Sequence, residues 1–115
     1  MDMESILLST KEMLGPSAED PHFEPEIITH INTVFMDLNQ MGVGPEDGFI
    51  IEDETTVWTD YIPNVKKLAA VKTYMYLRVR LLFDPPASAT IVETINREIG
   101  RYEWRITHAV EFTET

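Results

Sequence analysis

The residues of this sequence that could do chemistry are its histidines and its many carboxylates. His22 and His30 lie close to Glu24 and Glu26, and imidazole with carboxylate is a ligand combination that zinc accepts. Their spacing matches no known zinc motif, so structural roles for both histidines are the better interpretation. A metal-dependent enzyme built on these four side chains is the weakest of the three functions considered for the chain.

A glycine-rich segment lies in the middle of the chain. Gly42, Gly44 and Gly48 suggest a loop that could cradle a phosphate group. However, they follow an expected helix instead of a strand, and no lysine accompanies them. Glu46 and Asp47 in the same segment would repel an anion. Turn formation therefore explains the glycines better than phosphate binding does.

Other chemical signatures are absent from the sequence. Glu52, Asp53 and Glu54 are three adjacent carboxylates, but their spacing is not that of a calcium-binding EF-hand loop. The chain has no cysteine, and no serine lies in the G-x-S-x-G pattern of a nucleophile elbow. The sequence therefore predicts a protein that is not an enzyme, with no catalytic residue, no cofactor and no metal site.

Charge is distributed unevenly along the 115 residues, which we expect to form one domain, residues 1–115. Residues 1–60 hold 14 acidic residues and one basic residue, whereas residues 61–115 hold 6 acidic and 8 basic residues. The net charge of −11 argues against DNA binding by phosphate neutralisation. The asymmetry is either a solvated acidic surface or a sign that the acidic half of one copy faces the basic helix of the next. A contact of the second kind builds a ring if its rotation closes.

Apolar periodicity predicts an all-α fold, a small bundle of three to four helices with an irregular glycine-rich segment in the middle. The longest helix begins after the N-cap Asn64, ends before Pro85, and carries five of the nine basic residues. The other helices are expected over residues 4–14, from Pro25 to Met41, and from a cap at Ser88 or Thr90 to Ile106. No stretch has the roughly 20 apolar residues of a membrane span.

Several apolar residues are assigned to the core or left between two roles. Met13 and Leu82 are expected on the buried stripes of their helices. Trp58 is interpreted as a core anchor, because tryptophan is usually well buried. Residues 49–51 form either a short strand or an apolar plug beneath the loop.

The last helix carries basic and aromatic residues away from its apolar seam. These off-seam residues are Arg97, Arg101, Trp104 and Arg105. Tryptophan beside arginine is typical of interface hot spots, although Trp104 could instead pack on the first helix. The tail, residues 107–115, either frays or forms an extended arm with Val110 and Phe112 as apolar anchors.

Four stretches together resemble one known family. They are HINTVFMDLNQMGVGPEDGFIIED at 30–53, WTDYIP at 58–63, LAAVKTYMYLRVRLLFDPP at 68–86 and INREIGRYEWRI at 95–106. Their order of helices, glycine-rich break and LLFDPP stop resembles the small head–tail connector (adaptor) proteins of tailed phages and prophages. None of these stretches is a catalytic signature.

The resemblance implies a structural virion protein, made in the host cytoplasm and located in the phage neck. Such adaptors form a ring, commonly twelvefold, beneath the portal. They bind the portal above and a stopper or tail-completion protein below, and DNA passes through the channel without specific binding. The family's C-terminal segment often reaches into the portal, which in this chain would fall on residues 107–115 with Val110 and Phe112.

These observations give two leading hypotheses. In the ring adaptor, Arg101, Trp104, Arg105, Val110 and Phe112 form the subunit or portal interface. Arginines of the last two helices serve subunit contacts, and the carboxylates facing the channel or its rim are Glu46, Asp47, Glu52, Asp53 and Glu54. The alternative is an acidic DNA mimic that inhibits a host nucleic-acid enzyme. The basic central helix argues against the mimic, whose working face should be acidic.

Overall fold

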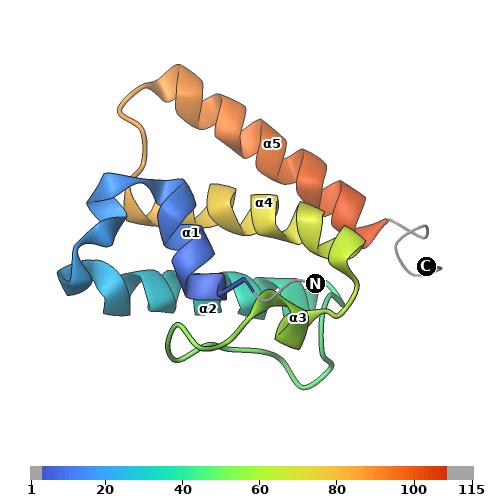
Figure 1. Ribbon diagram of the computed structural model, residues 1–115. Coiled ribbons are helices and arrows are strands. Elements are labelled where there is room, and N and C mark those ends of the chain that lie inside the picture. The colour runs from blue at the N-terminus through green and yellow to red at the C-terminus, as the bar shows by residue number, and fades with distance from the viewer. Residues whose placement is uncertain (1–3, 109–115) are drawn as a thin grey trace.

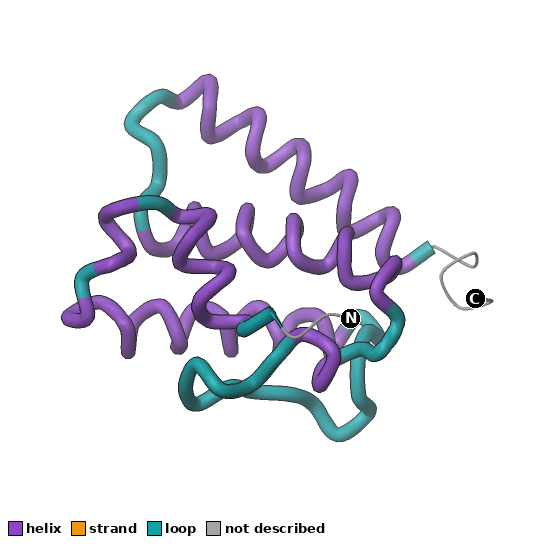
Figure 2. The backbone as a smooth tube through the Cα atoms, in the orientation of Figure 1, coloured by secondary structure: helices purple, strands orange, loops and turns teal. Residues whose placement is uncertain are grey.

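The computed structural model describes residues 4–108 of the chain, which fold as helices joined by loops (Figures 1 and 2). The α-helices are α1 (Ile6–Leu14), α2 (Glu24–Gln40), α3 (Trp58–Tyr61), α4 (Val65–Phe83) and α5 (Ala89–Thr107). Two 3-10 turns, Pro16–Glu19 and Pro21–Phe23, connect α1 to α2. The predicted all-α fold is confirmed, and no residue from 4 to 108 belongs to a strand.

Helix α4 is the central element, as its sequence predicts. The Asn64 side-chain oxygen accepts hydrogen bonds from the backbone N–H groups of Lys66 and Lys67, at 2.9 and 3.2 Å. It therefore satisfies two donors that the first turn would otherwise leave unpaired. The helix ends at Phe83, just before the two prolines. Figure 1 shows α4 running between α2 and α5, and it also packs against α1 and α3.

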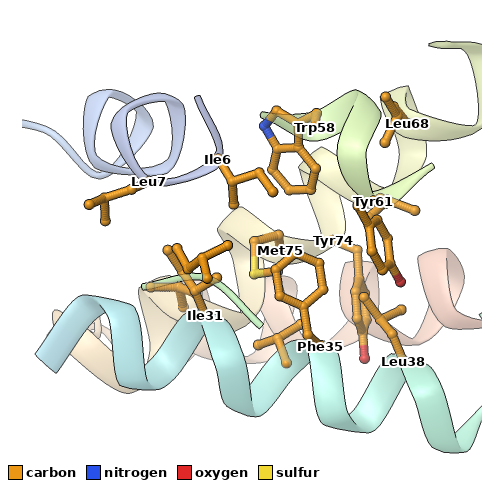
Figure 3. Packing of buried hydrophobic residues seen from close by; sticks show 14 of the residues in the cluster. Ile6, Leu7, Ile31, Phe35, Leu38, Trp58, Tyr61, Leu68, Tyr74 and Met75 are labelled. Carbon is orange, nitrogen blue, oxygen red and sulfur yellow. The ribbon is translucent and has the colours of Figure 1, made fainter. Parts of the chain in front are cut away.

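Side chains from α1, α2, α3 and α4 meet in one core (Figure 3). The Phe35 ring centroid lies 4.6 Å from that of Tyr61 and 6.2 Å from that of Trp58. Trp58 is 1% exposed, and its Nε1 donates a hydrogen bond to Ser9 Oγ at 2.9 Å. The prediction that Trp58 anchors the core is confirmed, and its polar N–H has the partner that burial requires.

The segment between α2 and α3 is an apolar plug and not a strand. Ile51 is buried, and the Asn32 side chain of α2 forms hydrogen bonds with both the backbone N–H and the backbone carbonyl of Ile51. Asn32 Oδ1 accepts from Ile51 N–H at 2.8 Å, and Asn32 Nδ2 donates to the Ile51 carbonyl at 3.0 Å. Phe49 packs its ring edge on Phe35. The Asn32 side chain thus satisfies both backbone groups of Ile51, as a neighbouring strand would in a sheet.

The structure corrects two details of the expected core and settles one cap. Met13 is 49% and Leu82 is 45% exposed, although both were predicted on buried stripes. Each is the penultimate residue of its helix, where fewer elements surround the backbone than at the helix middle. Of the two candidate caps of α5, Ser88 is the one that accepts a hydrogen bond, from the Ile91 N–H at 3.3 Å.

Candidate interaction surfaces

Helix α5 is amphipathic and packs along α4 through a single seam. Ile95, Ile99, Tyr102 and Ile106 repeat at helical spacing and lie against the core, and Ile99 is buried. Most of the remaining residues of α5 are exposed. Figure 1 shows why: α5 lies on the outside of the bundle, with α4 beneath it. The helix is therefore attached on one side and presents the opposite side to solvent.

A chain of hydrogen bonds fixes α5 to the two helices below it. The Tyr74 hydroxyl donates to Glu103 Oε2 of α5 at 2.8 Å and accepts from Arg78 Nη1 at 2.8 Å. Arg78 also donates to Asp37 Oδ2 of α2 at 2.6 Å. Burial, followed by the hydrogen bond to Glu103, raises the pKa of Tyr74 to about 12. Burial is the largest single effect and lowers the pKa of Arg78, but the hydrogen bonds and the charge interactions with Asp37 and Tyr74 together outweigh it, so the net shift is upward.

The solvent side of α5 collects basic and aromatic side chains, which we call the α5 outer face: Arg97, Arg101, Trp104, Arg105 and His108. Their spacing places them on one side of the helix, opposite the Ile99 seam. Trp104 is 64% exposed and stacks on His108, with ring centroids 4.9 Å apart. The option that Trp104 packs on the first helix is therefore excluded. Three of the predicted interface residues lie together here, whereas Val110 and Phe112 lie outside the described residues.

Two of the three arginines of the α5 outer face have local partners. Arg101 Nη1 lies 2.7 Å from Glu98 Oε2 one turn earlier, and the Arg105 guanidinium lies 5.0 Å from the Tyr102 ring centroid. The Arg101 pair is solvent-exposed, and such pairs contribute little to stability. The ion pair with Glu98 offsets the charge of Arg101, whereas Arg97 and Arg105 form no ion pair with a residue between 4 and 108, so the face keeps positive charge.

The predicted channel or rim carboxylates form a second surface, which we call the acidic segment: Glu46, Asp47, Glu52, Asp53 and Glu54. All five are exposed, and none forms an ion pair with a residue between 4 and 108. The hydroxyl and backbone N–H of Thr55 donate to Asp53 Oδ1, at 2.6 and 2.9 Å, and lower the pKa of that carboxyl. Figure 1 shows this segment at the edge of the molecule opposite α5, with α2 and α4 between them.

Much of the charge complementarity expected between copies is used within the chain. Lys72 Nζ lies 2.8 Å from Glu4, and Arg78 lies 2.6 Å from Asp37, so two cations of α4 pair with the acidic half of the same molecule. Arg80 Nε donates to the Asp84 carbonyl at 2.9 Å. The fold engages Arg78 and Arg80 within the chain, so these contacts give no support to the prediction that the arginines of the central helix face a neighbouring copy.

A pocket that the sequence did not reveal lies where the ends of several elements meet. It has a volume of about 430 Å³ and is lined by residues 42–45, residues 61–63, Lys67, Val71 and Ile106. Gly44 has φ +88°, and a Cβ there would lie 2.5 Å from the Tyr61 ring. Burial raises the pKa of Tyr61 above its ordinary value. In the sequence Gly44 indicated only a turn, because the ring that it approaches, that of Tyr61, lies 17 positions further along the chain.

The remaining candidate chemistry does not assemble into a site. His30 Nε2 lies 3.3 Å from Glu26 Oε2, one turn apart on the exposed side of α2. Within residues 4–108, no three side chains of His, Asp or Glu come together in a way that could hold a metal ion. Among the same residues, no helix has the length and apolar character needed to cross a bilayer.

Comparison with known proteins assigns the chain to a family. The family model described as "Phage connector protein" matches residues 6–113. The chain belongs to the phage connector protein family. This confirms the resemblance to head–tail connectors, and the match includes both the α5 outer face and the acidic segment. No curated protein and no solved structure matches this connector protein. The match gives no support to the acidic DNA mimic.

Proposed function

We propose that this connector protein is a structural, non-enzymatic subunit of a ring in the neck of a tailed phage virion. The observation that carries the proposal is the placement of opposite charges on opposite sides of the molecule. The α5 outer face holds three arginines, and the acidic segment holds five carboxylates without ion pairs among residues 4–108. Surfaces that differ and lie on opposite sides join copies head to tail, and such a contact closes into a ring when its rotation allows.

In this ring the acidic segment of one copy meets the α5 outer face of the next. Trp104 is the main anchor, because it is a large aromatic side chain that is 64% exposed and lies among arginines. Tryptophan and arginine are the residue types most enriched among interface hot spots. Family membership supports the partners beyond the ring: a portal protein above and a stopper or tail-completion protein below, with about twelve copies in the ring.

The excess negative charge suits a channel for DNA. Five carboxylates facing three arginines leave a net negative charge at each contact between copies. We place this excess charge at the channel or its rim. Carboxylates there repel phosphate groups, so the duplex slides without being held. A ring structure with the acidic segment on its outer wall would remove this part of the proposal.

The test is native mass spectrometry of the full chain, alone and mixed with the portal protein of the same phage. We expect rings, or many copies bound to each portal. A monomer indifferent to the portal would contradict the ring adaptor. Capture of one basic host enzyme by that monomer would instead favour the DNA mimic.

A further inference from the structure

The pocket described above has apolar side chains in its lining and room for an apolar group. Val43, Ile62, Val71 and Ile106 contribute aliphatic side chains, and the largely buried Tyr61 also lines the pocket. Its volume of about 430 Å³ lies within the range of about 300–1,000 Å³ that small binding pockets occupy. The Tyr61 hydroxyl donates to the Val43 carbonyl at 3.3 Å, so the main polar group of the wall is already satisfied.

Lys67 adds one charge to the pocket lining. It is half-buried, and its ammonium group forms no ion pair with any residue from 4 to 108. A cation beside an apolar hollow fits an apolar side chain that has a carboxylate next to it in sequence. This combination favours an acidic segment over a basic one as the occupant.

A segment with this chemistry follows the pocket directly in the chain. Ile106 lines the pocket, and α5 ends at Thr107. Residues 109–115 read AVEFTET, in which Glu111 lies between Val110 and Phe112. Phe112 follows His108 by four residues, which span up to about 14 Å when extended, enough to turn back to a pocket that α5 itself borders.

We propose that the pocket takes residues 109–115 of the same chain, with Phe112 in the apolar hollow and Glu111 paired with Lys67. The same chain is favoured over a second copy because the segment starts three residues after the pocket residue Ile106. A short tether of this kind gives an effective concentration of about millimolar. One consequence rests on the proposed ring function: Phe112 cannot occupy the pocket and contact a portal protein at the same time, so docking and assembly compete.

The first test is nuclear magnetic resonance of the methyl-labelled full chain. We expect nuclear Overhauser contacts between the Phe112 ring and the methyl groups of Ile62, Val71 and Ile106, at all protein concentrations. Phe112→Ser should abolish them and shift the amide signals of the pocket glycines, whereas Phe112→Leu should leave these glycine signals nearly in place. Absence of these contacts overturns the proposal. So do contacts that appear only between differently labelled chains in a mixed sample.

A charge exchange tests the pairing of the segment with the pocket. Lys67→Glu should weaken the Phe112 contacts, and Lys67→Glu with Glu111→Lys should restore them. Lys66→Glu is the matched control, because Lys66 is exposed, lies next in sequence and does not line the pocket. Equal effects of the Lys67 and Lys66 variants would contradict the assigned pairing. These measurements need no portal, so their failure is distinguishable from failure of the ring proposal.

Discussion

Two tryptophans of this chain lie in opposite environments, and the contrast separates the folding role of Trp58 from the binding role that we propose for Trp104. Trp58 is 1% exposed within the core, whereas Trp104 is 64% exposed on α5. Sequence alone suggested both roles but left Trp104 undecided. The spacing of Ile95, Ile99 and Tyr102 indicated the buried side of α5, but only the exposure of Trp104 in the structure shows that the first helix does not cover it.

Replacing each tryptophan by alanine should therefore have different consequences. We expect Trp104→Ala to change the free energy of unfolding by no more than about 0.5 kcal/mol, as for other surface positions. The same change should weaken assembly by about 2 kcal/mol or more at each contact. Trp58→Ala should cost about 3–5 kcal/mol of stability, because it leaves a cavity. Urea unfolding measures stability, and native mass spectrometry measures assembly. Equal destabilisation by both changes would contradict this division.

Two glycines form a second matched pair at the residue scale. Gly44→Ala places a Cβ 2.5 Å from the Tyr61 ring at a backbone φ of +88°, so we expect a loss of more than about 1 kcal/mol. Gly100→Ala lies within α5 with open space around the new methyl group, so it should stabilise by about 0.5–1 kcal/mol. Thermal unfolding of the two variants tests both signs. A neutral Gly44→Ala would show that the loop moves freely away from Tyr61.

At the scale of elements, helix ends and, apart from Met13 and Leu82, helix faces were predictable from the sequence, but links between distant segments were not. Asn64 and the prolines after Phe83 mark the ends of α4 through local chemistry. The pocket combines residues 42–45, residues 61–63 and Ile106, and no spacing rule brings such distant positions together. The same holds for the Asn32 bonds to Ile51. Local hydrogen bonds and periodicity depend on residues that are close in sequence. The pocket and the Asn32 bonds to Ile51 depend instead on how whole helices pack.

The hydrogen-bonded chain from Asp37 to Glu103 predicts a loss of stability in alkali. The folded-state pKa of Tyr74 is about 12 and lies above its ordinary value of 10.0. The folded state therefore holds this proton more tightly, so the contribution is complete below pH 10 and is lost as the pH rises towards 12.

Urea unfolding across this pH range measures the slope, with Tyr74→Phe as the test variant. The variant removes the titrating hydroxyl, so its free energy of unfolding should fall less steeply between pH 10 and 12. It should also be less stable at neutral pH by about 1–3 kcal/mol, because Arg78 and Glu103 lose a partner. Identical slopes for both proteins would show that Tyr74 does not ionise differently in the folded state.

At the scale of the whole molecule, the function we propose requires the connector to bind neighbouring copies without binding DNA. The fold separates these tasks by pairing Lys72 and Arg78 internally and leaving the arginines of α5 and the acidic segment on opposite sides. The sequence indicated the charge asymmetry, but it could not show which cations the fold itself neutralises. The charged side chains that stay on the α5 outer face and in the acidic segment define the surfaces available for assembly.

The central claim is that the α5 outer face of one copy binds the acidic segment of the next, and a charge exchange in the full chain tests it most directly. Arg101→Glu with Arg105→Glu should abolish rings in native mass spectrometry. Adding Asp53→Lys and Glu54→Lys to the same chain should restore them. Lys66→Glu, which belongs to neither surface, should leave them intact, and rings of the unaltered protein should weaken as salt screens the contact. Rings that survive the arginine reversal, or that the compensating lysines fail to restore, would contradict the account.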